Sequence, residues 1–388
     1  MPKLKKNTAA DRIIACSFQG GGALGAYQVG VTRALDEAGY YPDWFIGTSI
    51  GAINAAIAAG NPEKIRVEKM HQFWEAIATP DYLNPSLSIN TPETRKLEHF
   101  LSSQTTLFCG QPGFFQPRFP PPELGWHNTP DLLSYYDTSP LRSTLERFID
   151  FDRINSNATT RLSIGAVEIS SGKINYFDSF NQKIGPEHIM ASGALPPGFP
   201  AIEIEGKFYW DGGISSNSPA TYVLSNRCPK DLLCFTVHLF DSFGMNPTTL
   251  DEVLQRRKDI EFSSRVTKIL QLYKEIHSLK NSIHILSKYI PEHEKLSPEL
   301  KECISKGRET TVCLVRFLYE DDSTELSSKD YEFSHKSIIE RIAHGYNAGK
   351  KAIKESPWTE PVPDTEGILV HDMSAIDHLN IMKEEKDE

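Results

Sequence analysis

A serine stands between closely spaced glycines near the start of the chain. Gly47-Thr48-Ser49-Ile50-Gly51 has G-x-S-x-G spacing, follows a short apolar run and precedes a run of small residues. On such a strand-to-helix turn the serine hydroxyl projects above a sheet, and small flanking residues let the backbone turn tightly. The N-terminus of the following helix favours negative charge there. The pattern predicts that Ser49 is a nucleophile supported by Gly47 and Gly51, although a turn with a helix-capping serine has the same short pattern.

A glycine-rich segment precedes this serine and admits two functional interpretations. Gly20-Gly21-Gly22-Ala23-Leu24-Gly25 contains G-x-G-x-x-G, which in dinucleotide-binding folds is followed by an acidic residue closing the second strand. Asp43 is at a suitable distance but precedes its apolar run. The other interpretation is an oxyanion hole, in which the N–H groups of Gly20, Gly21 and Gly22 converge on a tetrahedral intermediate. We favour the oxyanion hole, supported by Gly25, because it explains both glycine elements together.

A carboxylate flanked by glycines lies much further along the chain. Asp211-Gly212-Gly213 follows the aromatic segment Phe208-Tyr209-Trp210. Glycines at 212 and 213 would let the Asp211 side chain approach another loop closely. Asp-Gly is also one of the commonest turn dipeptides, so this segment alone predicts only a turn.

Histidines offer an alternative base for the serine. The chain has 12 of them, and a Ser–Asp–His order would match an α/β-hydrolase triad. His238 lies in an apolar run typical of a buried strand, whereas His335 and His344 lie on a charged segment predicted to be a solvated helix. None has a motif around it, so the triad is the weaker hypothesis.

The elements around these residues predict an α/β fold. Residues 12–18 and 43–46 form apolar runs typical of buried strands, and residues 23–38 and 52–59 are predicted helices. Alternation of strand and helix at this spacing predicts a parallel sheet with right-handed crossovers. Paired strands are expected at 162–167 and 173–177, and another buried strand at 233–239.

The remainder of the chain differs in composition and in hydrophobic pattern. Residues 108–130 combine prolines with aromatic residues and predict an irregular loop, either braced on the domain or acting as a lipid-facing lid. After residue 241 the sequence becomes charged and helically periodic over 250–290, strand-like over 311–319 and helical again over 334–355. We expect a flexible tail over residues 1–11, a catalytic domain over 12–240 and a mainly helical region over 241–388 packed on it.

Composition narrows the class of protein. The formal net charge of −10 argues against a nucleic-acid-binding protein. The six cysteines show no metal-site or disulfide spacing, which fits a reducing compartment. No secretory signal precedes residue 12, and the longest apolar stretch, residues 52–59, is far shorter than the roughly 20 residues of a membrane-spanning helix. We therefore expect no transmembrane segment and a cytoplasmic protein, peripheral to membranes at most, with export lacking an N-terminal signal left open.

The three glycine-flanked motifs, in this order, resemble those of the patatin-like phospholipase family. Segments on either side of Asp211 resemble it too, Ala191-Ser192-Gly193-Ala194-Leu195-Pro196 before it and Asn217-Ser218-Pro219 after it. The likeness covers residues 12–240, and the region beyond is similar to the C-terminal extension of a bacterial subgroup. The resemblance implies a three-layer α/β/α fold with a mostly parallel central sheet, with Ser49 as nucleophile, Asp211 as its dyad partner and Gly20 to Gly22 as the oxyanion loop.

The dyad implies a chemistry that needs neither metal nor cofactor. A free aspartate has a pKa near 3.9, so burial that raised it would make Asp211 a better base at neutral pH. Ser49 would then form an acyl-enzyme that water hydrolyses. The family often carries Arg or Lys where this chain has Leu24, so backbone amides alone would stabilise the oxyanion.

Three functional hypotheses follow for the chain. The first is a lipid acyl hydrolase of phospholipase A or lysophospholipase type, acting on a lipid or membrane-surface substrate. The second is an esterase or thioesterase acting on non-phospholipid acyl or hydroxyalkanoate esters. The third is a non-catalytic nucleotide-binding or scaffold protein. A homo-oligomer is compatible with all three.

Overall fold

The computed structural model describes residues 12–80, 91–120, 122, 129–156, 160–226, 228–307, 310–360 and 366–373. The tail predicted over residues 1–11 lies outside these ranges, as does part of the loop predicted over 108–130. All six cysteines are described, and each is a free thiol.

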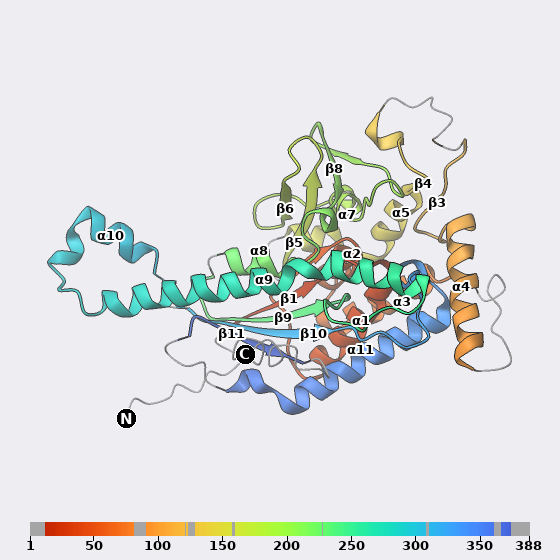
Figure 1. Ribbon diagram of the computed structural model, residues 1–388. Coiled ribbons are helices and arrows are strands. Elements are labelled where there is room, and N and C mark those ends of the chain that lie inside the picture. The colour runs from red at the N-terminus through yellow and green to blue at the C-terminus, as the bar shows by residue number, and fades with distance from the viewer. Residues whose placement is uncertain are drawn as a thin grey trace.

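A central β-sheet organises the molecule (Figure 1). Within the described residues its strands follow the order β11-β10-β9-β1-β2-β5-β8-β7, and β6 also pairs with β5. Six neighbouring strands run parallel: β11 (Ile368–Asp372), β10 (Val312–Leu318), β9 (Leu232–His238), β1 (Ile13–Phe18), β2 (Trp44–Thr48) and β5 (Arg161–Glu168). The antiparallel pairings involve β6 (Ile174–Asp178), β7 (Ile202–Ile204) and β8 (Lys207–Asp211). The mostly parallel sheet is as predicted.

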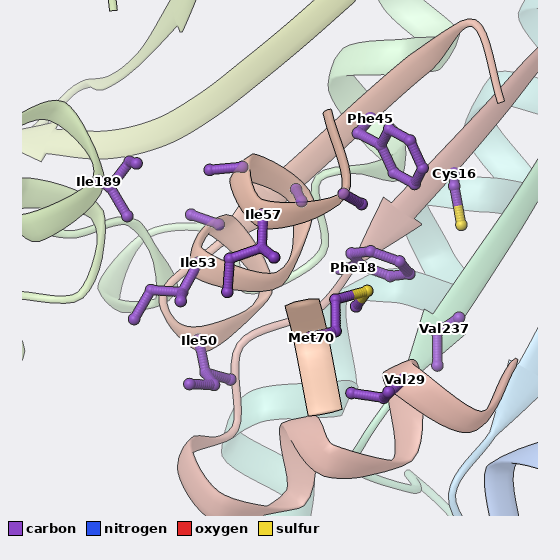
Figure 2. Packing of buried hydrophobic residues seen from close by; sticks show 14 of the residues in the cluster. Cys16, Phe18, Val29, Phe45, Ile50, Ile53, Ile57, Met70, Ile189 and Val237 are labelled. Carbon is purple, nitrogen blue, oxygen red and sulfur yellow. The ribbon is translucent and has the colours of Figure 1, made fainter. Parts of the chain in front are cut away.

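Helices cover both faces of this sheet because alternate strand residues point to opposite sides. Cys16 and Phe45 belong to one apolar cluster, whereas Ala15 and Trp44 belong to another. The first cluster includes side chains of α1 (Ala26–Glu37), α2 (Ile50–Ala59), α3 (Glu63–Ala76) and α11 (His335–Glu355). Figure 2 shows Ile53, Ile57 and Met70 gathered beside Phe18 in this cluster. The second includes side chains of α8 (Ala220–Ser225) and the long α9 (Leu250–Ser287), which lie across the sheet from α11 in Figure 1. The predicted three-layer α/β/α fold is confirmed.

The region after residue 241 contributes strands as well as helices. β10 and β11 extend the parallel sheet beyond β9, and α11 packs along α1. The single-turn helix η7 (Lys329–Tyr331) precedes α11 and reaches the carboxyl ends of the central strands, where it meets the glycine segment at residue 22. This region therefore helps to form the surroundings of the predicted site.

Other elements complete the shell around the sheet. They are α4 (Pro92–Cys109), α5 (Ser139–Phe148), α6 (Phe151–Asn155), α7 (Pro186–Ser192) and α10 (Pro298–Ser305), with a small ribbon of β3 (Gln116–Pro117) and β4 (Tyr136–Asp137). No helix in the described ranges combines the length and apolar character needed to cross a bilayer.

Candidate active site

Ser49 occupies a sharp turn between β2 and α2. Its φ of 56° lies in a region that non-glycine residues rarely adopt, a conformation that stores about 1–3 kcal/mol of strain. The flanking glycines are required by packing: a Cβ at Gly47 would lie 2.2 Å from the Gly51 carbonyl oxygen, and one at Gly51 would lie 2.3 Å from that of Phe18. The backbone therefore holds Ser49 in a strained turn, as the G-x-S-x-G pattern predicts.

The buried side chain of Ser192 hydrogen-bonds the backbone of this turn. The Ser49 N–H donates to Ser192 Oγ at 3.0 Å, and the Ser192 hydroxyl donates to the Gly165 carbonyl oxygen at 2.6 Å. Ser192 is fully buried at the end of α7. The sequence places Ser192 in a segment that resembles the family but predicts no role for it, because both of its partners are distant in sequence.

The structure brings Asp211 to Ser49. Asp211 ends β8, is only 2% exposed and accepts a 2.7 Å hydrogen bond from the Gly213 N–H. Burial raises the pKa of its carboxyl to about 6, although hydrogen bonds from the Ser49 side chain and the Gly213 amide act to lower it. A carboxylate with this pKa is largely ionised at pH 7 and still basic enough to accept a proton from a hydroxyl.

The glycine segment lies against the same serine. A Cβ at Gly20 would lie 2.8 Å from Ser49 Cβ, and one at Gly22 would lie 2.0 Å from the Asp330 carbonyl oxygen of η7. Gly22 also has a φ of +55°. Only glycines therefore allow this segment to pass between the serine turn and η7. Leu24 is fully buried in the core and places no charge near Ser49.

Gly25, Gly212 and Asn217 join the motifs to one another. Gly25 closes the short helix η2 (Gly22–Gly25), and a Cβ there would meet Ile50 of α2 at 2.8 Å. A Cβ at Gly212 would lie 2.5 Å from the Gly165 carbonyl oxygen of β5. Asn217 Nδ2 donates to the Gly20 carbonyl oxygen at 3.0 Å, so the loop after Asp211 holds the glycine segment directly. The sequence alone predicts no role for Asn217.

Ser49, Asp211 and Gly20 to Gly22 line one cavity of about 190 Å³. Much of its remaining wall is apolar and includes six phenylalanines, Phe114, Phe115, Phe199, Phe240, Phe262 and Phe333. Phe114 and Phe115 come from the Pro/aromatic segment predicted as a braced loop or a lid. Both are buried, and Phe119 of the same segment is 93% exposed.

The described lining of this cavity contains no histidine, so no imidazole is placed there to serve as a base. His238 is buried beside Thr236, and burial together with the charge of Arg316 lowers its pKa to about 3. His335 and His344 are exposed on α11.

Asp43, the acidic residue considered for nucleotide binding, directly precedes β2 and accepts a hydrogen bond from the Ile14 N–H, so it lies at the amino ends of the strands, away from the glycine segment. Across the described residues, no group of His, Cys, Asp and Glu is placed to hold a metal ion.

Comparisons with known proteins identify the family of this chain. The patatin-like phospholipase family model matches residues 16–224, and a second model described as a patatin phospholipase matches residues 260–365. The human and mouse patatin-like phospholipase domain-containing protein 6 are 37% identical over 81 residues, which is 21% of this chain and 6% of theirs. The match thus spans a small part of those relatives.

Two solved structures are similar to this chain at low sequence identity. VipD from Legionella pneumophila has a TM-score of 0.39 at 14% identity, covering 89% of this chain and 67% of that one. Human GIVD cytosolic phospholipase A2 has a TM-score of 0.35 at 10% identity, covering 90% and 63%. The family model, which matches more than half of the chain, settles the assignment: this chain belongs to the patatin-like phospholipase family.

Proposed function

We propose that this protein is a lipid acyl hydrolase that cleaves carboxylic esters through a Ser49–Asp211 dyad. The observation that carries the proposal is that Ser49 and the buried Asp211 line one largely apolar cavity beside the glycine segment, with the Ser49 side chain acting to lower the pKa of the Asp211 carboxyl. Membership of the patatin-like phospholipase family supports a lipid ester as the substrate.

In the proposed reaction Asp211 takes the proton of the Ser49 hydroxyl as Ser49 Oγ attacks the ester carbonyl carbon. N–H groups of Gly20 to Gly22 stabilise the resulting oxyanion. In other enzymes, removal of one such donor raises the activation free energy by about 2.7–4 kcal/mol. The tetrahedral intermediate then collapses, and Asp211 returns the proton to the departing alcohol. Water attacks the acyl-enzyme, Asp211 takes the water proton, and release of the acid regenerates the Ser49 hydroxyl.

Two substitutions test the dyad. Ser49→Ala and Asp211→Asn should each lower kcat/KM for ester hydrolysis by at least about 10³-fold, since subtilisin loses about that much or more when a residue of its catalytic unit is removed. The far-ultraviolet circular dichroism and the unfolding midpoint show whether each variant is folded. Hydrolysis at the wild-type rate by either folded variant would rule out the Ser49–Asp211 dyad.

A lipid panel distinguishes phospholipase A or lysophospholipase activity from hydrolysis of non-lipid esters. Micellar phospholipids and lysophospholipids are compared with soluble short-chain esters and thioesters, using Ser49→Ala as the blank. Turnover confined to soluble esters would favour the esterase or thioesterase hypothesis.

A further inference from the structure

The C-terminal half of α9 carries a regular apolar stripe, called here the α9 stripe. Its residues alternate between isoleucine and leucine at spacings of three and four: Ile269, Leu272, Ile276, Leu279, Ile283 and Leu286. This spacing is typical of a two-stranded coiled coil, in which the alternate positions are called a and d. Isoleucine at every a position and leucine at every d position is the combination that favours parallel dimers.

The leucines of the α9 stripe are exposed to solvent. Their exposed fractions, in chain order, are 55%, 65% and 64%. Ile276 and Ile283 are half-buried, the latter beside the turn at Gly307. An apolar stripe confined to a and d is the narrow contact surface of a coiled coil, whereas a helix that packs on a globular core has a wider apolar face. The α9 stripe therefore suits another helix as its partner.

The side of α9 that contacts its own chain is a different one. Leu270 and His277 are buried, and His277 Nε2 donates to the Leu224 carbonyl oxygen at 3.2 Å. Leu272 and Leu279 each follow one of these two buried residues by two positions, which is about 200° around a helix. Figure 1 shows the C-terminal end of α9 extending with α10 away from the sheet. The leucines therefore point away from the protein's own core.

Charges beside the α9 stripe complement a second copy of the same helix. Glu275 precedes an a residue and Lys280 follows a d residue, so they occupy the heptad positions g and e. Within one chain the two are five residues apart, which is not the spacing of an ion pair along a helix. In a parallel coiled coil, a g residue lies beside the e residue of the next heptad on the other helix. Each Glu275 carboxylate then meets the partner's Lys280 ammonium, and symmetry makes two such pairs.

We infer that two copies of this chain associate through a parallel coiled coil formed by their α9 stripes. The body of each copy packs on the side of α9 that carries Leu270 and His277, so the two bodies lie on opposite sides of the paired helices. Phe262 of α9 lines the cavity that contains Ser49, so parallel pairing puts both cavities at the same end of the coiled coil. This assembly does not depend on the proposed hydrolysis.

The mass of the full-length protein in solution tests the association. Sedimentation equilibrium over about 1 to 200 μM should give a mass that approaches twice the 43.6 kDa of one chain. Leu279→Glu should raise the dissociation constant of the dimer at least about 100-fold, because each copy loses a leucine that the dimer buries. Its far-ultraviolet circular dichroism should match the wild type, since this leucine is exposed in the single chain.

Leu254→Glu is the matched control for this substitution. Leu254 is also exposed on α9 but lies outside the α9 stripe, so the dissociation constant should not change. A wild-type protein that stays monomeric up to about 200 μM would overturn the inference. A folded Leu279→Glu variant that dimerises as tightly as the wild type would overturn it as well.

Exchange of the two charges tests the parallel arrangement. Glu275→Lys and Lys280→Glu each place like charges across both g–e pairs, so each variant alone should dimerise about tenfold more weakly. An equimolar mixture of the two variants restores opposite charges in both pairs, and a heterodimer as tight as the wild-type dimer should form. A mixture that associates no more tightly than either variant alone would overturn the parallel pairing.

A lipid surface is the other occupant that an exposed apolar stripe suits, and vesicle flotation distinguishes it. The Ser49→Ala variant is used with phosphatidylcholine vesicles so that the lipid stays intact. A monomer that floats with the vesicles, and that Leu279→Glu releases, would overturn the inference in favour of a membrane contact. A Ser49→Ala dimer that Leu279→Glu dissociates supports the inference even where the wild type hydrolyses no ester, so the assembly and the proposed function fail separately.

Discussion

At the scale of single residues, the burial of Asp211, the proposed base, has a cost in stability. Its pKa is raised from 3.8 to about 6 by burial, so the unfolded chain releases this proton at lower pH than the folded protein does. Below about pH 4 this group therefore leaves the free energy of unfolding unchanged. Between about pH 4 and pH 6 the free energy of unfolding falls as the pH rises, and above about pH 6 the destabilisation by the buried carboxylate is complete. A shift of about two units corresponds to at most about 3 kcal/mol.

Asp211→Asn should therefore be inactive but more stable than the wild type, by about 1–3 kcal/mol at pH 7.5 and by little at pH 4. Urea denaturation at the two pH values measures this. Asp178→Asn is the contrasting control. Burial acts to raise the pKa of Asp178, but hydrogen bonds from Arg161 and Ser163 outweigh it and lower the pKa, so that variant should be destabilised at pH 7.5. Equal destabilisation of both variants would contradict the account.

Ser192 makes a second residue-scale prediction. Ser192→Ala removes the acceptor of the Ser49 N–H and the donor to the Gly165 carbonyl oxygen. Leaving these buried groups unpaired should lower the free energy of unfolding by about 1–3 kcal/mol. Loss of the support beneath Ser49 should lower kcat about 10- to 100-fold, by misplacing the nucleophile. Ser143→Ala, an exposed control, should change neither quantity. An unchanged kcat in Ser192→Ala would show that the turn holds without this bridge.

The two kinds of site residue differ in how far the sequence reveals them. Ser49 could be predicted because its turn is a local pattern in which the glycines flank it directly. Ser192 could not be given a role, since its partner Ser49 lies 143 positions away. The cavity lining from Phe240, Phe262 and Phe333 escaped prediction for the same reason: a phenylalanine carries no local sign of which wall it joins.

At the scale of elements, η7 links α11 to the cavity lined by Ser49. Arg341 of α11 donates to the Glu332 and Lys329 carbonyl oxygens and to Glu325 Oε1. Residues of η7 in turn pack against Gly22 and line the cavity. Arg341 is 2% exposed, so its charge is compensated within the protein.

Arg341→Met should therefore destabilise the protein by about 3–5 kcal/mol, because it leaves the Glu325 carboxylate buried without its cation. Lys350→Met on the same helix is the control, since the Lys350 side chain is half exposed and should change stability by less than about 0.5 kcal/mol. Chemical denaturation measures both variants. Similar small effects would show that η7 is held by other contacts.

Elements with strong local patterns could be predicted, and those defined by distant partners could not. β1, β2 and α9 lie close to their predicted ranges because each has an apolar run or a capped helical pattern. β7 and β11 were not predicted, since each is a short strand that owes its place to its neighbours in the sheet. α4 continues to Cys109, within the segment expected to be an irregular loop.

At the scale of the whole molecule, the sheet crosses the boundary expected near residue 241. β9 pairs with β10 along its whole length, and α1 packs on α11. A fragment ending at residue 241 would expose the β9 edge and the apolar face of α1. We expect this fragment to aggregate on expression, because an unpaired apolar strand edge templates association. Sedimentation of the fragment beside the full chain measures this, and a soluble fragment with cooperative unfolding would make residues 12–240 an independent domain.

We propose that the buried Asp211 carboxylate activates Ser49 without an imidazole. The most direct measurement is the rate at which a fluorophosphonate labels Ser49, followed across pH 4.5 to 8.5 in the wild type and in Asp211→Asn, with the labelled residue located by peptide mass spectrometry. We expect labelling at Ser49 that rises with pH around a midpoint of about 6, as Asp211 loses its proton, and labelling slowed at least about 100-fold in Asp211→Asn. Labelling at another residue, or an unchanged rate and midpoint in Asp211→Asn, would contradict the proposal.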